Sequence, residues 1–172
     1  AAMKDMIASF EQYSVREGLS KPVVSSGILR YRVDPESGPA ILMSISKPED
    51  SVIRVSKDRM ETYLPEDKQL EVIDLKEGEA GARAVDATVL LFGKPRAFWD
   101  AHYETTLLPK ASPKDPDELS LVPKDAGLRK TLMEIRMWVD PDTALPIRVR
   151  YRYARGEEVT LSFTDLKVNQ GL

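Results

Sequence analysis

The feature that most constrains the fold is a strict alternation of side chains near the C-terminus. In residues 146–153, every second side chain is apolar or aromatic, and the side chains between them are arginines. Residues 157–165 repeat the pattern with apolar and hydroxyl side chains, and Arg155-Gly156 lies between the two runs. A period of two is that of a strand with one buried face, and a short glycine turn between two such runs predicts a β-hairpin.

Short strand-like runs of this kind recur along most of the chain. They are rich in β-branched, aromatic and other apolar residues, and turns containing Pro, Asp, Lys or Gly separate them. A spacing of about ten residues between strands is typical of an antiparallel meander. The predicted strands are 28–33, 40–46, 51–56, 60–64, 69–75, 102–108, 118–122, 131–139, 146–153 and 157–165.

The segment before Gly18 has a different period. Its apolar side chains recur at the spacing of one helix face, with charged and polar residues on the other side, which predicts an amphipathic helix of about four turns. Such a helix would pack its apolar stripe against a sheet. The side chains of this stripe are Met3, Met6, Ile7, Phe10 and Tyr13.

The middle of the chain is ambiguous. Residues 84–92 form an apolar run that fits either a buried helix or a strand, because period alone does not separate the two at this length. Gly93 and Pro95 end the run, and the aromatic pair Phe98-Trp99 follows. We expect one or two short helices here.

These elements predict a single domain over residues 1–172. The length is 172 residues, no linker-like segment interrupts it, and a chain of this size buries about 70% of its unfolded surface. About 10–11 antiparallel strands with one apolar face must curl around that face. The predicted fold is α+β and mainly β: a curved, incomplete antiparallel barrel whose N-terminal helix and short helices form a lid over a concave apolar cavity.

Composition excludes several classes of partner. Lys plus Arg number 25 against 28 Asp plus Glu, with signs interspersed, so we expect no nucleic-acid partner. No run approaches the roughly 20 apolar residues of a membrane span. The chain has no cysteine, which removes thiol nucleophiles and thiolate metal sites. It opens with Ala1-Ala2-Met3-Lys4, so we expect any secretory signal to have been removed; an anchoring cysteine removed with it is not excluded.

Catalytic and metal-binding patterns are missing from the sequence. His102 is the only histidine, and no Gly-x-Ser-x-Gly motif accompanies it. There is no His-Glu-x-x-His motif, no calcium-binding loop and no glycine-rich phosphate loop. We therefore expect neither an enzyme nor a metal or other cofactor.

Methionine and aromatic side chains gather on or near the predicted strands. Methionine adapts to varied apolar shapes, so such residues line sites for loosely defined hydrophobic ligands, but they also fill ordinary cores. Composition alone favours an ordinary core, whereas an incompletely filled half-barrel would leave a ligand cavity. Both interpretations stay open at this point.

Several motifs resemble one family in order and spacing. Phe10-Glu11-Gln12 is similar to a Phe-x-Gln motif, and residues 27–31 to a Gly-x-Leu-x-aromatic first strand. Residues 47–56 are similar to a third strand that has the motif Pro-x-x-x-hydrophobic. Residues 60–65 are similar to the motif Leu-x-x-Tyr-x-Pro. Further matches are Leu121-Val122-Pro123-Lys124, similar to Leu-x-Pro-Lys, and residues 161–169, similar to a terminal strand ending in Asn. This set, spread over nearly all the chain, resembles the LolA/LolB family of periplasmic lipoprotein carriers and receptors.

The resemblance implies a non-enzymatic periplasmic carrier. Such a protein binds the acyl chains of a lipoprotein or a related lipid in a half-barrel cavity and helps to transfer them to the outer membrane. Its implied partners are an inner-membrane release complex and an outer-membrane receptor, with peripheral membrane contact. The alternative is a lipid- or protein-sensing module of the cell envelope that has the same fold and does not transport cargo.

On this hypothesis, two groups of residues contact the lipid. The concave wall is expected to contain Tyr31, Ile41, Met43, Ile45, Met133 and Met137. The lid or its surroundings are expected to contain Leu90, Leu91, Phe92, Phe98 and Trp99.

Overall fold

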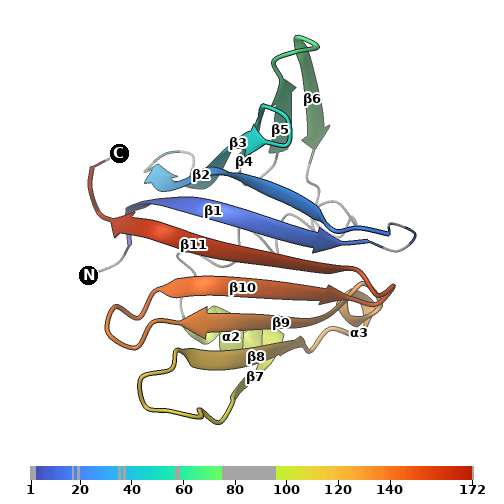
Figure 1. Ribbon diagram of the computed structural model, residues 1–172. Coiled ribbons are helices and arrows are strands. Elements are labelled where there is room, and N and C mark those ends of the chain that lie inside the picture. The colour runs from blue at the N-terminus through green and yellow to red at the C-terminus, as the bar shows by residue number, and fades with distance from the viewer. Residues whose placement is uncertain are drawn as a thin grey trace. The chain divides into compact units, whose positions relative to one another are not determined.

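The computed structural model describes residues 3–16, 18, 20–34, 36, 38–56, 59–74 and 96–171. Within these residues, strands predominate and the two helices are short (Figure 1). The ambiguous run 84–92, with Leu90, Leu91 and Phe92, lies outside the described residues. The strands are β1 (Asp5–Val15), β2 (Val23–Asp34), β3 (Gly38–Lys47), β4 (Ser51–Val55), β5 (Arg59–Leu64), β6 (Gln69–Asp74), β7 (Tyr103–Leu107), β8 (Asp117–Pro123), β9 (Leu132–Val139), β10 (Pro146–Tyr153) and β11 (Glu158–Val168), and the helices are α2 (Arg96–His102) and α3 (Ala126–Arg129).

The described strands form one eleven-stranded sheet in the order β6-β5-β4-β3-β2-β1-β11-β10-β9-β8-β7. Because β6 and β7 lie at its two ends, the sheet is not closed. Each of the ten predicted strand runs overlaps one observed strand, so the prediction of a mainly antiparallel β protein is confirmed. The expected concave cavity stays a prediction.

The prediction of an N-terminal helix is wrong. This segment is β1, which lies between β2 and β11 in the sheet. Met6, Ala8 and Phe10 are buried on one face with a period of two, while Tyr13 is 46% exposed. Met6 and Phe10 fit both a helical and a strand period, so the sequence pattern did not separate them; pairing on both edges of β1 decides in favour of the strand.

The chain divides into two compact units, which are described separately below. Unit 1 contains Ala1–Phe10, Ser25–Lys94 and Asp165–Leu172, and unit 2 contains Glu11–Val24 and Pro95–Thr164. The expectation of a single domain stays a prediction.

In unit 1, β2, β3 and β4 carry an apolar core face. Tyr31 pairs with Ile41, and Ile41 pairs with Val55, so one row of buried side chains crosses three strands. Leu29 pairs with Met43 in the next row, and both are buried. Successive side chains along a strand point to opposite faces, so the neighbours of these residues in sequence form a second face.

In unit 2, the core face crosses β8 to β11. One row joins Leu121, Ile135 and Tyr151, all buried. Helix α2 lies behind β8 and β9 in Figure 1, and the rings of Trp99 and Tyr103 are 5.6 Å apart between centroids. Tyr103 itself is buried, so α2 packs beside the apolar face of this unit.

Candidate ligand site

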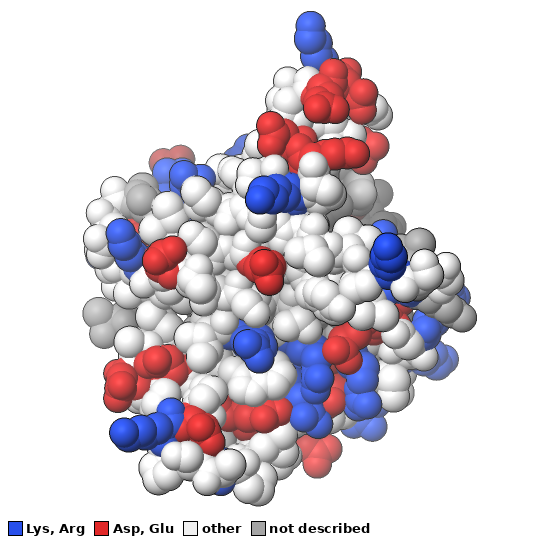
Figure 2. All heavy atoms as spheres, in the orientation of Figure 1, with Lys and Arg blue, Asp and Glu red and all other residues white. Residues whose placement is uncertain are grey.

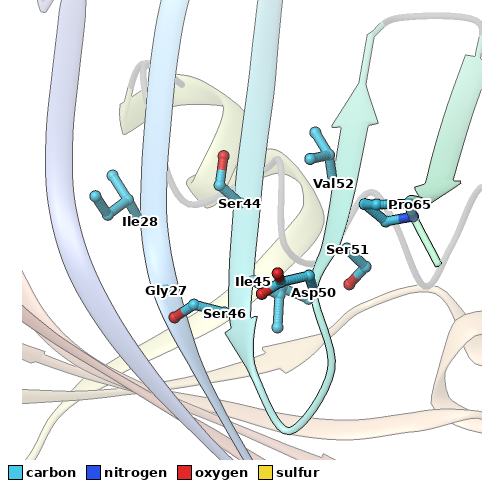
Figure 3. Close-up of a pocket in the computed structure, with 9 residues that line it drawn as sticks. All are labelled: Gly27, Ile28, Ser44, Ile45, Ser46, Asp50, Ser51, Val52 and Pro65. Atoms are coloured by element: carbon cyan, nitrogen blue, oxygen red, sulfur yellow. The ribbon is translucent and has the colours of Figure 1, made fainter.

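An open pocket of about 370 Å³ lies over β2, β3 and β4 of unit 1 (Figure 3). Its volume is at the lower end of the range of about 300–1,000 Å³ that small-molecule sites occupy. Ile28, Ser44 and Val52 stand on three neighbouring strands, and Pro65 lies beyond Val52. We call this the apolar pocket; it is lined by Gly27, Ile28, Ser44, Ile45, Ser46, Asp50, Ser51, Val52 and Pro65.

The strand register explains why these residues converge. Ser44 pairs with Ile28 on one side and with Val52 on the other, so the three side chains share the second face of the sheet. The short hydroxymethyl group of Ser44 between two branched apolar side chains leaves room above the middle strand. The register shifts between Ser26 and Gly27, so that Ser46 of β3 is skipped at this pocket.

A second pocket of about 360 Å³ lies over the same three strands. Arg30 pairs with Leu42, and Leu42 pairs with Arg54, so two guanidinium groups flank an apolar side chain. Arg32 pairs with Ala40 in the next row, where the small side chain leaves space. We call this the arginine pocket; it is lined by Arg30, Tyr31, Arg32, Asp34, Ala40, Ile41, Leu42 and Arg54.

The arginines of this second pocket are only partly neutralised. Arg32 lies 3.8 Å from a carboxylate oxygen of Asp34, and Arg54 lies 3.4 Å from one of Glu61. The side chains of Arg32 and Arg54 are 62% and 60% exposed, so these ion pairs are weak. Within the described part of the chain, Arg30 has no ion-pair partner. The pocket therefore carries an excess of positive charge.

The predicted wall residues of unit 1 lie close together. Tyr31, Ile41 and Met43 are buried on the core face, and burial raises the pKa of the Tyr31 phenol. Ile45 is half-buried and lines the apolar pocket, although its position in the strand alternates with those of Ser44 and Ser46.

The predicted residues of unit 2 divide into buried and exposed. Met137 is buried in the row with Val149, whereas Met133 is 43% exposed. A bulge explains the difference: Arg152 pairs with Glu134 and Tyr153 with Leu132, so Met133 is skipped and Leu132 takes the core face. Phe98 and Trp99 lie half-buried on α2, and Leu90, Leu91 and Phe92 lie outside the described residues.

The arginine stripe of β10 takes part in an ion-pair network on the second face of unit 2. Glu134 is buried, accepts a 2.6 Å hydrogen bond from the Ser120 hydroxyl, and lies 3.1 Å from Arg136 and 3.0 Å from Arg152. Figure 2 shows acidic and basic side chains side by side on this face. Burial by itself raises the pKa of Glu134, but these hydrogen bonds and arginine charges outweigh it, so the pKa is lowered.

On the same face, two arginines of β10 lie over the ring of Trp138. The guanidinium carbons of Arg148 and Arg150 lie 5.7 and 5.6 Å from its ring centroid. Both distances are within the range of a cation–π contact.

His102 is the last residue of α2 rather than part of a strand. Its Nδ1 lies 2.9 Å from the carbonyl oxygen of Phe98, and its ring stacks on the Phe98 ring at 4.3 Å. Among the described residues, no group of acidic, histidine or cysteine side chains could hold a metal ion. Neither described helix is long and apolar enough to cross a membrane.

Of the residues that line the two pockets, sequence reasoning named Tyr31, Ile41 and Ile45 and missed the others, because it assigned the ligand to the core face alone. Ile28 directly precedes Leu29, so β2 carries apolar side chains on both faces at this point. This break in the alternation, followed by Arg30 two residues later, is the sequence signal that could have indicated the apolar pocket.

A scan against protein-family models finds no match, and a search of curated proteins finds none either. Among solved structures, a DUF1329 family protein from Desulfovibrio piger is 15% identical with a TM-score of 0.53, over 99% of this chain and 88% of that one. MucB is 14% identical with a TM-score of 0.53, over 96% of this chain, which spans only 54% of MucB. A LolA superfamily protein from Nitrosomonas europaea is 13% identical with a TM-score of 0.45, over 98% of this chain and 87% of that one. At these identities a structural likeness shows the fold alone, and the chain shares its fold with the DUF1329 family protein and with the matched part of MucB.

Proposed function

We propose that this protein is a non-enzymatic binding protein of the bacterial periplasm that takes acyl chains of a lipoprotein or a related lipid. The observation that carries the proposal is the apolar pocket of about 370 Å³ with Ile28, Val52 and Pro65 in its wall. Burial of each CH₂ group contributes about 0.8 kcal/mol, so part of one chain is enough for weak, reversible binding. The resemblance of the sequence motifs to the LolA/LolB family also supports the proposal, because proteins of that family bind acyl chains.

A carrier also needs a site that opens and closes. We propose that α2, with Phe98 and Trp99, acts as a lid over the apolar face that contains Met137 in unit 2. The half-buried aromatic rings of α2 support this role: Trp99 packs beside Tyr103, with ring centroids 5.6 Å apart, and Phe98 packs against Trp99. The buried residues Tyr31, Ile41 and Met43 form the corresponding proposed wall in unit 1. Opening this lid would release cargo held on the core face of unit 2 to an outer-membrane receptor, whereas the apolar pocket of unit 1 is open without it.

Filling the apolar pocket tests the proposal. Ser44→Phe places a ring between Ile28 and Val52, and aromatic residues are well tolerated in strands. We expect isothermal titration calorimetry with decanol to detect binding by the parent protein and a reduction of about tenfold or more by the variant. Unreduced binding by Ser44→Phe would overturn the placement of the ligand, and no binding by the parent protein would overturn the proposed function.

The matched control is Ser162→Phe. Ser162 lies in β11 on the second face of unit 2, where it pairs with Arg148. This variant adds the same ring to the same kind of strand position outside the pocket. We expect it to bind decanol as the parent protein does, with circular dichroism confirming that both variants fold.

The alternative function is a sensing module that recognises a protein partner without transporting cargo. MucB was solved in a complex with MucA from Pseudomonas aeruginosa, at a TM-score of 0.50 to this chain. Here β6 is the end strand of the described sheet, with Leu70, Val72 and Ile73 exposed, and such an edge can pair with a partner strand. Deletion of a carrier would mislocalise acylated proteins, whereas deletion of a sensor would change gene expression and leave their localisation intact.

A further inference from the structure

The two pockets of unit 1 are neighbours on the same face of the same strands. Ile28 and Arg30 are two residues apart on β2, and Val52 and Arg54 are two residues apart on β4. Alternate residues of a strand share a face and lie about 6.6 Å apart. Ser44 and Leu42 give the same step on β3. The apolar pocket therefore borders the arginine pocket along all three strands.

The charges differ sharply between the two pockets. Among the described residues, Asp50 is the one charged residue that lines the apolar pocket, whereas three arginines and Asp34 line the arginine pocket. Glu61 pairs with Arg54 but also lies 3.9 Å from Arg59, so its charge is shared. The arginine pocket is thus cationic in a chain whose formal net charge is −3.

The floor of the arginine pocket is suited to the part of an apolar tail that lies next to the charged end of a ligand. Leu42 lies between Arg30 and Arg54, and Ala40 lies beside Arg32. A guanidinium group donates paired hydrogen bonds that match a carboxylate or a phosphate. A ligand with a charged end over Leu42 and a tail extending toward Ser44 would satisfy both pockets at once.

From this juxtaposition we infer that the site binds a single-chain amphiphile with an anionic head group, a carboxylate or a phosphate monoester. The head group lies among Arg30, Arg32 and Arg54, and the chain lies in the apolar pocket. This inference rests on the proposed function and adds the chemical class of its ligand. Since Arg32 and Arg54 are largely exposed, the head-group contribution falls as salt rises.

Calorimetry with decanoate, decanol and acetate at pH 7.5 separates the contributions. Decanoate and decanol share a chain, and decanoate and acetate share a head group. We expect the parent protein to bind decanoate about tenfold more tightly than decanol at low salt, because charge-assisted hydrogen bonds are worth about that factor, and acetate far more weakly than either. The double variant Arg30→Gln/Arg54→Gln should lose the preference and keep its affinity for decanol.

Arg148→Gln is the control variant. Arg148 is also an exposed strand arginine, but it lies on unit 2 over Trp138. We expect it to keep the full preference for decanoate, which would show that loss of a strand arginine elsewhere does not remove the preference.

The outcomes distinguish the two proposals. Equal binding of decanoate and decanol by the parent protein would overturn this inference and leave the proposed function standing. A preference that survives in the double variant would also overturn it. Acetate binding as strong as that of decanoate would show a simple anion site and overturn the amphiphile. No binding of decanol or decanoate would overturn the proposed function.

Discussion

A Cβ atom added at Gly27 would lie 2.0 Å from the backbone carbonyl oxygen of Ser44. The Cα of Ile45 would lie 2.9 Å away, so the added atom would meet the backbone of β3 rather than a side chain that can rotate. Glycine is therefore required where β2 approaches β3 at the apolar pocket. This gives a physical reason for the glycine in the Gly-x-Leu-x-aromatic motif of residues 27–31.

The first prediction concerns this contact. Gly27→Ala should lower the free energy of unfolding by about 2–3 kcal/mol, because the strands must separate to admit the methyl group. Urea denaturation measures the change. Ser26→Ala at the neighbouring position should stay within about 0.5 kcal/mol of the parent protein. Equal stability of the two variants would contradict the close approach.

The second prediction is a pH dependence of stability from Glu134. Its pKa is lowered in the folded protein from the ordinary value of 4.5, so unfolding takes up a proton in acid. The stabilisation is therefore complete above the unfolded value and is lost as pH falls through the lower, folded value. Urea titrations from neutral pH to about pH 3 should show a shallower loss for Glu134→Gln than for the parent protein.

Glu104→Gln supplies the comparison for this variant. Glu104 is an exposed residue of β7 and makes no contact with Arg136 or Arg152 in the network described above. At neutral pH its variant should stay within about 0.5 kcal/mol of the parent protein. At neutral pH, Glu134→Gln should be less stable by about 1–3 kcal/mol, because two arginines lose their charged partner.

The third prediction compares two apolar residues of β9. Ile135 is fully buried between Leu121 and Tyr151, whereas the bulge leaves Met133 43% exposed. Ile135→Ala should cost about 2–5 kcal/mol and Met133→Ala less than about 1 kcal/mol. Chemical denaturation of both variants measures this difference, and a large loss for Met133→Ala would contradict the register at the bulge.

The fourth prediction concerns Asn169, which follows the last strand with φ of 55°. Its side-chain oxygen accepts a 2.8 Å hydrogen bond from the Lys4 backbone N–H, and its own N–H donates to the Asp5 carbonyl at 2.9 Å. Asn169→Gly keeps the backbone conformation and loses only the acceptor, so it should cost about 0.5–1.5 kcal/mol. Asn169→Ala should cost about 1–2 kcal/mol more, because alanine disfavours positive φ. Thermal denaturation that ranks the two variants equally would contradict this account.

The strand content was predictable because the alternation is strong. The arginine and apolar pattern of β10 and the hydroxyl pattern of β11 predicted a hairpin, and the two strands pair in register from Arg148 with Ser162 to Arg152 with Glu158. Tyr31 alternates with Arg30 and Arg32 in β2, and Met43 precedes Ser44 in β3. This alternation within each strand predicted that Tyr31 and Met43 are buried. These features depend on local periodicity alone.

The errors arose where pairing between distant segments decides the structure. Met6 and Phe10 fit a helix as well as a strand, and only their place between β2 and β11 selects the strand. Met133 and Met137 share a face in a regular strand, but the bulge opposite Arg152 and Tyr153 separates them. The two pockets depend on which residues stand opposite each other across three strands, which no single run of sequence reveals.

The bulge in β9 also determines how the protein would respond to oxidants. Peroxide converts accessible methionine into a polar sulfoxide, and a sulfoxide within a packed interior disrupts it. Met133 projects into solvent, whereas Met6, Met43 and Met137 are shielded. An oxidant should therefore convert Met133 into the sulfoxide before those three residues. The packing of the interior would then stay intact while the surface thioether is oxidised.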